Sequence, residues 1–98
     1  MKRLACLLVI AAAACSPRVP PPATASDASR AHVELSALAQ GRTLLIQKCG
    51  SSCHATPLPM QHLAAEWPAK LGEMAERSHL DPQQRALIEK YLVTMSSR

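Results

Sequence analysis

Apolar residues recur along much of the chain at steps of three and four, the spacing of one face of an α-helix. Between residues 33 and 48 this spacing is carried by Leu35, Leu38 and Leu45, and Gly41 interrupts the run. An isolated glycine costs about 1 kcal/mol relative to alanine inside a helix, so it usually has a packing reason. The pattern therefore predicts an amphipathic helix over 33–48 in which Gly41 is kept for packing.

A second helical pattern runs from about residue 62 to residue 78. The residues that share its apolar face are Trp67, Leu71, Met74 and Ala75. Pro68 fits the first turn of a helix, where its missing N–H is no loss. The residues before it, Leu63–Glu66, are therefore predicted to form a separate short turn.

A third helix is predicted to start at Asp81. Asp81 suits the N-cap, Pro82 the first turn, and Gln84 the reciprocal position of a capping box. The buried face of this helix is predicted at Leu87, Ile88, Tyr91 and Leu92. Because no stretch alternates with a period of two, we expect no sheet, and the fold class is all-α with about three helices.

The N-terminus has the pattern of a bacterial lipoprotein signal. Lys2 and Arg3 precede an unbroken apolar run of eleven residues that ends at residue 14, too short for a membrane-spanning helix. Small residues then lead into Cys15. We expect residues 1–14 to be a signal peptide and Cys15 to become the lipidated first residue. The alternative is ordinary cleavage nearby, with Cys15 incidental.

Residues 15–31 are expected to be a flexible linker, because the segment 16–29 is rich in Pro, Ala and Ser and has little to bury. Residues 32–98 then form one small domain. The chain contains one Trp, one Tyr and no Phe. It therefore has few large side chains with which to fill the core of so small a domain. A large apolar cofactor would fill the centre. The net charge is +4 and no basic stripe is present, so nucleic acid is not an expected partner.

Two cysteines and a histidine follow the first predicted helix. Cys49 and Cys53 stand four residues apart, and His54 comes directly after the second. This segment resembles a stretched form of the c-type haem attachment signature, in which two residues normally separate the cysteines. Two thioethers would fix the haem, and His54 would lie beneath the iron. Residues at i and i+4 share one helix face, and a local bulge helped by the backbone freedom of Gly50 would absorb the extra residue.

Two other interpretations of this segment stay open. Cys49 and Cys53 could form a disulfide, since an exported protein meets oxidising conditions. They could also bind zinc together with His54 and His62. The helical patterns on both sides favour haem over either alternative.

The stretch from Leu38 to Met95 resembles the small single-haem c-type cytochromes of the bacterial periplasm. The resemblance rests on residues 41–45 with the cysteine motif, on Glu66-Trp67-Pro68 with Met74, and on Leu80 with Tyr91-Leu92. It implies a small cytochrome c-like domain wrapped around one covalent haem c. The family's first and last helices cross closely, a small residue meeting an aromatic one, and this contact would be Gly41 against Tyr91.

The same resemblance implies iron ligands. His54 is the expected proximal ligand, and its other ring nitrogen should donate to a backbone carbonyl. Met74 is the preferred sixth ligand, although an ordinary core methionine is the alternative. The other candidates for this position are Met60, Met95, His62 and His79. Trp67 is expected either to pack on the haem or to be an ordinary core residue.

The function that follows is a lipid-anchored electron carrier of the periplasm, held to the outer or inner membrane, monomeric, and exchanging electrons with a donor and an acceptor protein. No constellation of catalytic acid, base or nucleophile is visible, so an enzyme is not expected. Two alternatives remain. One is a haem-based gas or ligand sensor with an open sixth site. The other is a haem-free envelope lipoprotein with a Cys49–Cys53 disulfide.

Overall fold

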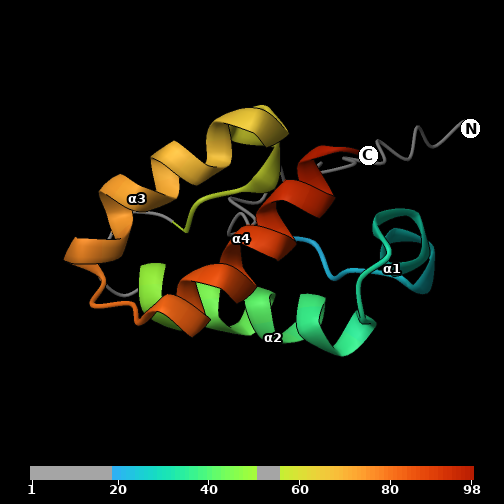
Figure 1. Cartoon of the computed structure of the whole chain (residues 1–98), viewed down its shortest axis with the longest axis horizontal. Helices are drawn as coiled ribbons and strands as arrows, with labels where there is room; N and C mark the ends of the chain where they lie inside the picture. The colour runs from blue at the N-terminus through green and yellow to red at the C-terminus, as the bar shows by residue number, and fades with distance from the viewer. Residues whose placement is uncertain (1–18, 51–55) are drawn as a thin grey trace, which may run out of the picture.

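The computed structural model describes residues 19–50 and 56–98, and within these ranges the chain is helical with no strand (Figure 1). The prediction of an all-α fold is confirmed. The elements in chain order are α1 Ala25–Ala31, α2 Leu35–Leu44, the π-helical turn η1 Leu45–Cys49, the 3-10 turns η2 Pro59–Gln61 and η3 Ala64–Glu66, α3 Trp67–Arg77 and α4 Pro82–Ser96. None of these helices is long and apolar enough to cross a membrane.

The C-terminal helix α4 is the centre of the structure, with α2 on one side and α3 on the other (Figure 1). It begins with the predicted capping box: Asp81 Oδ1 accepts from the Gln84 N–H at 2.7 Å, and Gln84 Oε1 accepts from the Asp81 N–H at 3.1 Å. Its buried face carries Ile88, Tyr91 and Leu92, each 0% exposed. The predicted cap and most of the predicted buried face are confirmed.

Helices α2 and α4 cross with backbone in contact at Gly41. A Cβ atom on Gly41 would lie 2.2 Å from the carbonyl oxygen of Leu87 and 2.9 Å from Cβ of Tyr91. No side chain fits there, so the glycine is what lets the two helices approach. The expected contact between Gly41 and Tyr91 is confirmed.

The helix predicted over 33–48 is divided into two parts. The α-helix runs from Leu35 to Leu44, and residues Leu45–Cys49 form a π-helical turn, in which hydrogen bonds span one residue more than in an α-helix. Leu45 and Cys49 are both 0% exposed. These two residues stand four apart, and the turn places both on the core side.

Helix α3 starts after a separate 3-10 turn, as predicted from Pro68. The turn covers Ala64–Glu66, and Pro68 occupies the first turn of α3. The apolar face of this helix is buried at Trp67, Leu71 and Ala75, while Met74 is half-buried.

The segment before α2 differs from the prediction of a flexible linker over 15–31. Residues 25–31 form the helix α1, and Thr24 and Asp27 make a capping box at its start. Asp27 is only 5% exposed and forms ion pairs with Arg30 at 3.1 Å and Arg98 at 2.7 Å. The composition of this segment cannot show that Asp27 pairs with Arg98, which lies 71 residues further along the chain. The sequence alone therefore suggests a flexible tether. Residues 1–18, including the predicted signal peptide, lie outside the described residues.

Candidate cofactor site

The predicted cofactor-binding residues that can be placed lie in and around one apolar cluster. The cluster is formed where η1, α3 and α4 meet, and its buried members are Leu45, Cys49, Trp67, Leu71, Ile88, Tyr91, Leu92 and Met95. Met74 and Leu80 are partly buried and pack against it. Residues from the first, second and third predicted helices are therefore brought together around Cys49.

Cys49 is the last residue of the π-helical turn and is 0% exposed. Cys53, His54 and the predicted lipidation site Cys15 lie outside the described residues. Within the ranges 19–50 and 56–98 no group of three or more His, Cys, Asp or Glu side chains could hold a metal ion. Two of the four residues considered for zinc, Cys49 and His62, lie within those ranges.

Gly50 has a role that differs from the predicted one. Its backbone is ordinary right-handed helix, with φ −69° and ψ −24°, so no special freedom is used. A Cβ atom there would lie 2.5 Å from the Ile46 carbonyl oxygen and 2.8 Å from Oγ1 of Thr56. The glycine therefore allows Thr56 to lie close to the end of η1.

The candidates for a sixth ligand are separated by their positions. Met74 packs against the cluster from α3, and Met95 is buried within it on α4, 1% exposed. Met60 is 80% exposed. His79 is exposed at the turn between α3 and α4, with a left-handed φ of 53°. The two methionines in contact with the cluster are thus better placed than Met60 or His79.

Trp67 and His62 form a small group of their own beside the cluster. The indole Nε1–H of Trp67 donates to the carbonyl oxygen of Pro59 at 3.1 Å. The His62 ring stands edge-on to Trp67 with centroids 4.9 Å apart, and its Nδ1 lies 3.5 Å from a carboxylate oxygen of Glu66. The polar end of Trp67 is therefore used by the protein backbone, and the buried ring faces the core.

One polar atom near the end of α3 lacks a hydrogen bond. The Ser78 residue is 7% exposed, and its Oγ finds no partner in the part of the chain that the structure describes. Such atoms are rare in native structures and require an explanation. The sequence gives no signal for Ser78, because an isolated serine at a helix end is commonplace.

Tyr91 ties the N-terminal segment to the core. Its hydroxyl donates to the carbonyl oxygen of Pro21, and Arg42 Nε donates to the carbonyl oxygen of Pro20 at 2.8 Å. Burial of the phenol raises the pKa of Tyr91 to about 12, although the nearby Arg42 and Arg98 oppose the shift. Tyr91 is therefore un-ionised across the physiological pH range.

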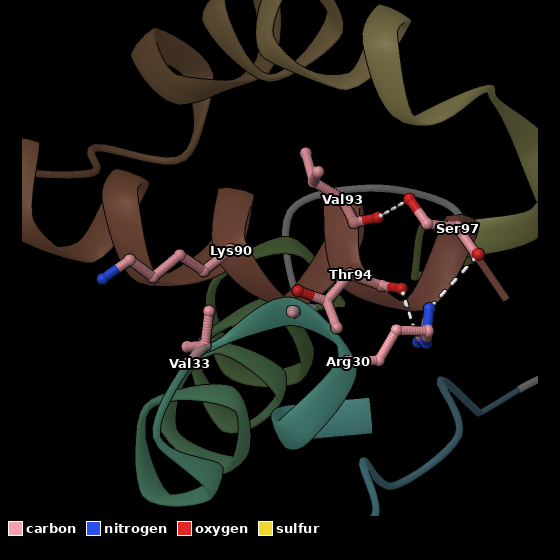
Figure 2. Close-up of a pocket in the computed structure, with 7 residues that line it drawn as sticks. Arg30, Val33, Lys90, Val93, Thr94 and Ser97 are labelled. Carbon is pink, nitrogen blue, oxygen red and sulfur yellow. Dashed lines mark hydrogen bonds between the residues drawn. The ribbon is translucent and has the colours of Figure 1, made fainter. Parts of the chain in front are cut away.

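A cavity of about 420 Å³ lies away from Cys49, between the end of α1 and the outer side of α4 (Figure 2). Arg30 reaches across its edge and donates to the carbonyl oxygens of Thr94 and Ser97, both at 3.2 Å. None of the predicted cofactor-binding residues lines it.

Comparisons with family models, curated proteins and solved structures found no match for this chain.

Proposed function

We propose that this protein is an electron carrier that holds one covalent haem c through Cys49 and Cys53 and is anchored to a periplasmic membrane through Cys15. The observation that carries the proposal is the position of Cys49. It ends the helix that packs on α4, lies fully buried in the apolar cluster, and precedes the second cysteine of the motif by four positions and the histidine by five. A thioether to haem places the cysteine against the apolar porphyrin ring. The apolar cluster around Cys49 is an environment that suits such a ring.

The residues around Cys49 are compatible with a porphyrin in two respects. The cluster is apolar, which suits the macrocycle and excludes water. Met74 offers a thioether sulfur, the soft ligand that raises the potential of haem iron. These observations support the proposal without fixing the geometry of the bound group.

In this proposal each residue has a separate task. Cys49 and Cys53 hold the haem permanently, His54 ligates the iron, and Met74 is the preferred second axial ligand. The haem itself supplies the one-electron change between ferrous and ferric iron. The close crossing of α2 and α4 at Gly41 fixes the helix that leads to Cys49 against α4. The role is transfer of electrons between partner proteins rather than catalysis.

The first test is the intact mass of the mature protein from a host competent in haem attachment. We expect the mass of the lipidated chain plus one haem, and loss of the covalent haem in a Cys49→Ser, Cys53→Ser double variant. A Ser51→Ala variant, which changes the segment but no thiol, should keep the haem. A wild-type chain without haem would refute the proposal and favour the haem-free lipoprotein with a Cys49–Cys53 disulfide.

The second test assigns the sixth ligand by visible spectroscopy. Met74→Leu keeps the side-chain volume nearly constant, so it should remove the weak red band of sulfur-ligated ferric haem and lower the potential without unfolding the domain. Met60→Leu at the exposed position is the matched control and should change neither. If Met95→Leu removes the band instead, Met95 is the ligand. A high-spin wild-type protein that binds carbon monoxide readily would indicate a sensor.

A further inference from the structure

The segment of residues 20–31, here called the strap, is built into the domain along its whole length. At its start, Arg42 Nε donates to the Pro20 carbonyl oxygen at 2.8 Å and the Tyr91 hydroxyl donates to that of Pro21. Pro20 is fully buried, and Ala23 packs against the apolar cluster. The proline-rich part of the strap is therefore attached to both α2 and α4.

The second half of the strap is the helix α1, which is fixed to the end of α4 by charge. Asp27 receives two hydrogen bonds from the Arg98 guanidinium, at 2.7 and 3.0 Å. Arg30 bonds Asp27 and, in addition, the carbonyl oxygens of Thr94 and Ser97 (Figure 2). Hydrogen bonds to ionised groups are roughly twice as strong as neutral ones. This arrangement is a docked element and not a flexible tether.

Docking of the strap changes how far an anchor at Cys15 can let the domain move. Pro20 is five residues from Cys15, so the chain between them spans at most about 17 Å when fully extended. If the strap were free, the nearest fixed residue would be Leu35, twenty residues from Cys15. A flexible chain of that length has a root-mean-square span of about 25 Å and a full extension of about 70 Å.

We propose that the strap holds the electron-carrying domain against the membrane surface, so that it meets partner proteins that are themselves membrane-bound. This inference rests on the proposed lipid anchor at Cys15. It goes beyond the proposed function because it names where the carrier works and which residues confine it there. If the strap were free, the domain could reach a soluble partner well above the bilayer. With the strap docked, the domain stays within the short length of chain between Cys15 and Pro20 from the headgroups.

The test measures the distance between domain and bilayer by neutron reflectometry on the lipidated holoprotein in a supported phospholipid bilayer. Wild type should lie within about 17 Å of the headgroups, the limit set by the docked strap. Asp27→Ala and Arg98→Ala, each combined with Arg42→Ala and Tyr91→Phe so that both ends of the strap are released, should move the domain outward and broaden its distribution, toward the span of about 25 Å for a free segment. Glu73→Ala, an exposed carboxylate on α3, is the matched control and should leave the distance unchanged.

Hydrogen exchange of the same samples reports directly whether the strap is docked on the domain. Amides of α1 should exchange at least about tenfold faster in both combined variants than in wild type, the factor expected for loss of a charge-assisted hydrogen bond. Circular dichroism checks that α2–α4 remain folded, and the combination that contains Arg98→Ala, at an exposed terminal position, keeps the test usable if the one that contains Asp27→Ala unfolds. Equal distances in all four proteins, or unprotected α1 amides in wild type, would overturn the proposal.

The mass spectrum separates the possible failures. A mature chain without lipid on Cys15 removes the anchor and overturns the strap proposal. A chain with lipid but without haem refutes electron transfer, and the bilayer distance of that chain still decides whether the strap confines the domain.

Discussion

Replacement of Gly41 by alanine should separate the two central helices. The new Cβ atom would stand 2.2 Å from the carbonyl oxygen of Leu87 and 2.9 Å from both its carbonyl carbon and Cβ of Tyr91, where ordinary contact requires at least 3.4 Å. The atoms it meets are backbone or directly attached to it, so no rotamer change relieves the overlap. Helices α2 and α4 must therefore move apart by about 1 Å, a gap that forfeits a quarter to a half of each dispersion contact across it.

The size of the stability loss follows from two opposing effects, the cost of overpacking and the gain in helix propensity. Overpacking of a well-packed interface costs about 1–3 kcal/mol, and a clash with backbone belongs at the upper end. Alanine recovers about 1 kcal/mol through its better helix propensity. The free energy of unfolding of Gly41→Ala should thus fall by about 2 kcal/mol, which for a domain of this size lowers Tm by about 8–16 °C.

The assay is thermal unfolding of the holoprotein, followed by far-ultraviolet circular dichroism, with Gly72→Ala as the control. Gly72 also lies in a helix, but its new Cβ atom would meet only the Arg85 guanidinium, at 3.2 Å. That flexible side chain can move, so Gly72→Ala should leave Tm unchanged or raise it by the gain in propensity. A Gly41→Ala protein that melts at or above the wild-type temperature would refute the reasoning.

Three further predictions concern buried polar groups. Wild type should lose stability between pH about 10, where the phenol ionises in the unfolded chain, and pH about 12, the raised pKa of Tyr91. In urea unfolding, the free energy of unfolding of Tyr91→Phe should fall less steeply across this range. Parallel pH dependences of wild type and variant would show that Tyr91 is not the group responsible. Hydrogen bonds from Arg98 and Thr24 lower the pKa of Asp27, so stability should fall as the pH drops below about 4; Asp27→Asn should be less stable at neutral pH and less sensitive to acid in the same assay. Trp67→Phe removes the hydrogen bond to Pro59 and leaves a small cavity, so it should cost about 1–3 kcal/mol in urea unfolding, and an unchanged midpoint would show that the bond contributes nothing.

Local sequence signals predict the elements well because their physics is local. The capping box of Asp81 and Gln84 is complete within four residues, and Pro68 marks the first turn of α3 wherever that helix packs. The close approach at Gly41 was expected from the resemblance to small cytochromes, and the structure contains it.

The features that the sequence does not reveal depend on distant residues. The capping box of Thr24 and Asp27 is a local signal for α1, but the burial of Asp27 depends on Arg98 at the other end of the chain. The role of Gly50 depends on the returning segment at Thr56. At the candidate cofactor site, the sequence names Cys49 and Met74, but the burial of Met95 in the same cluster depends on how α4 packs against η1 and α3.

The π-helical turn gives the helix before the cysteines a tolerance for changes in length. Residues Leu45 and Cys49 reach the core across a turn that contains one residue more than an α-helical turn. Deletion of the exposed Gln47 would leave the two residues three apart, a spacing that a regular α-helix also places on one face. The shortened chain should therefore keep the helix content and the cooperative unfolding of wild type, as circular dichroism would report, because the wider turn can close to an ordinary one without moving the cysteine off the core.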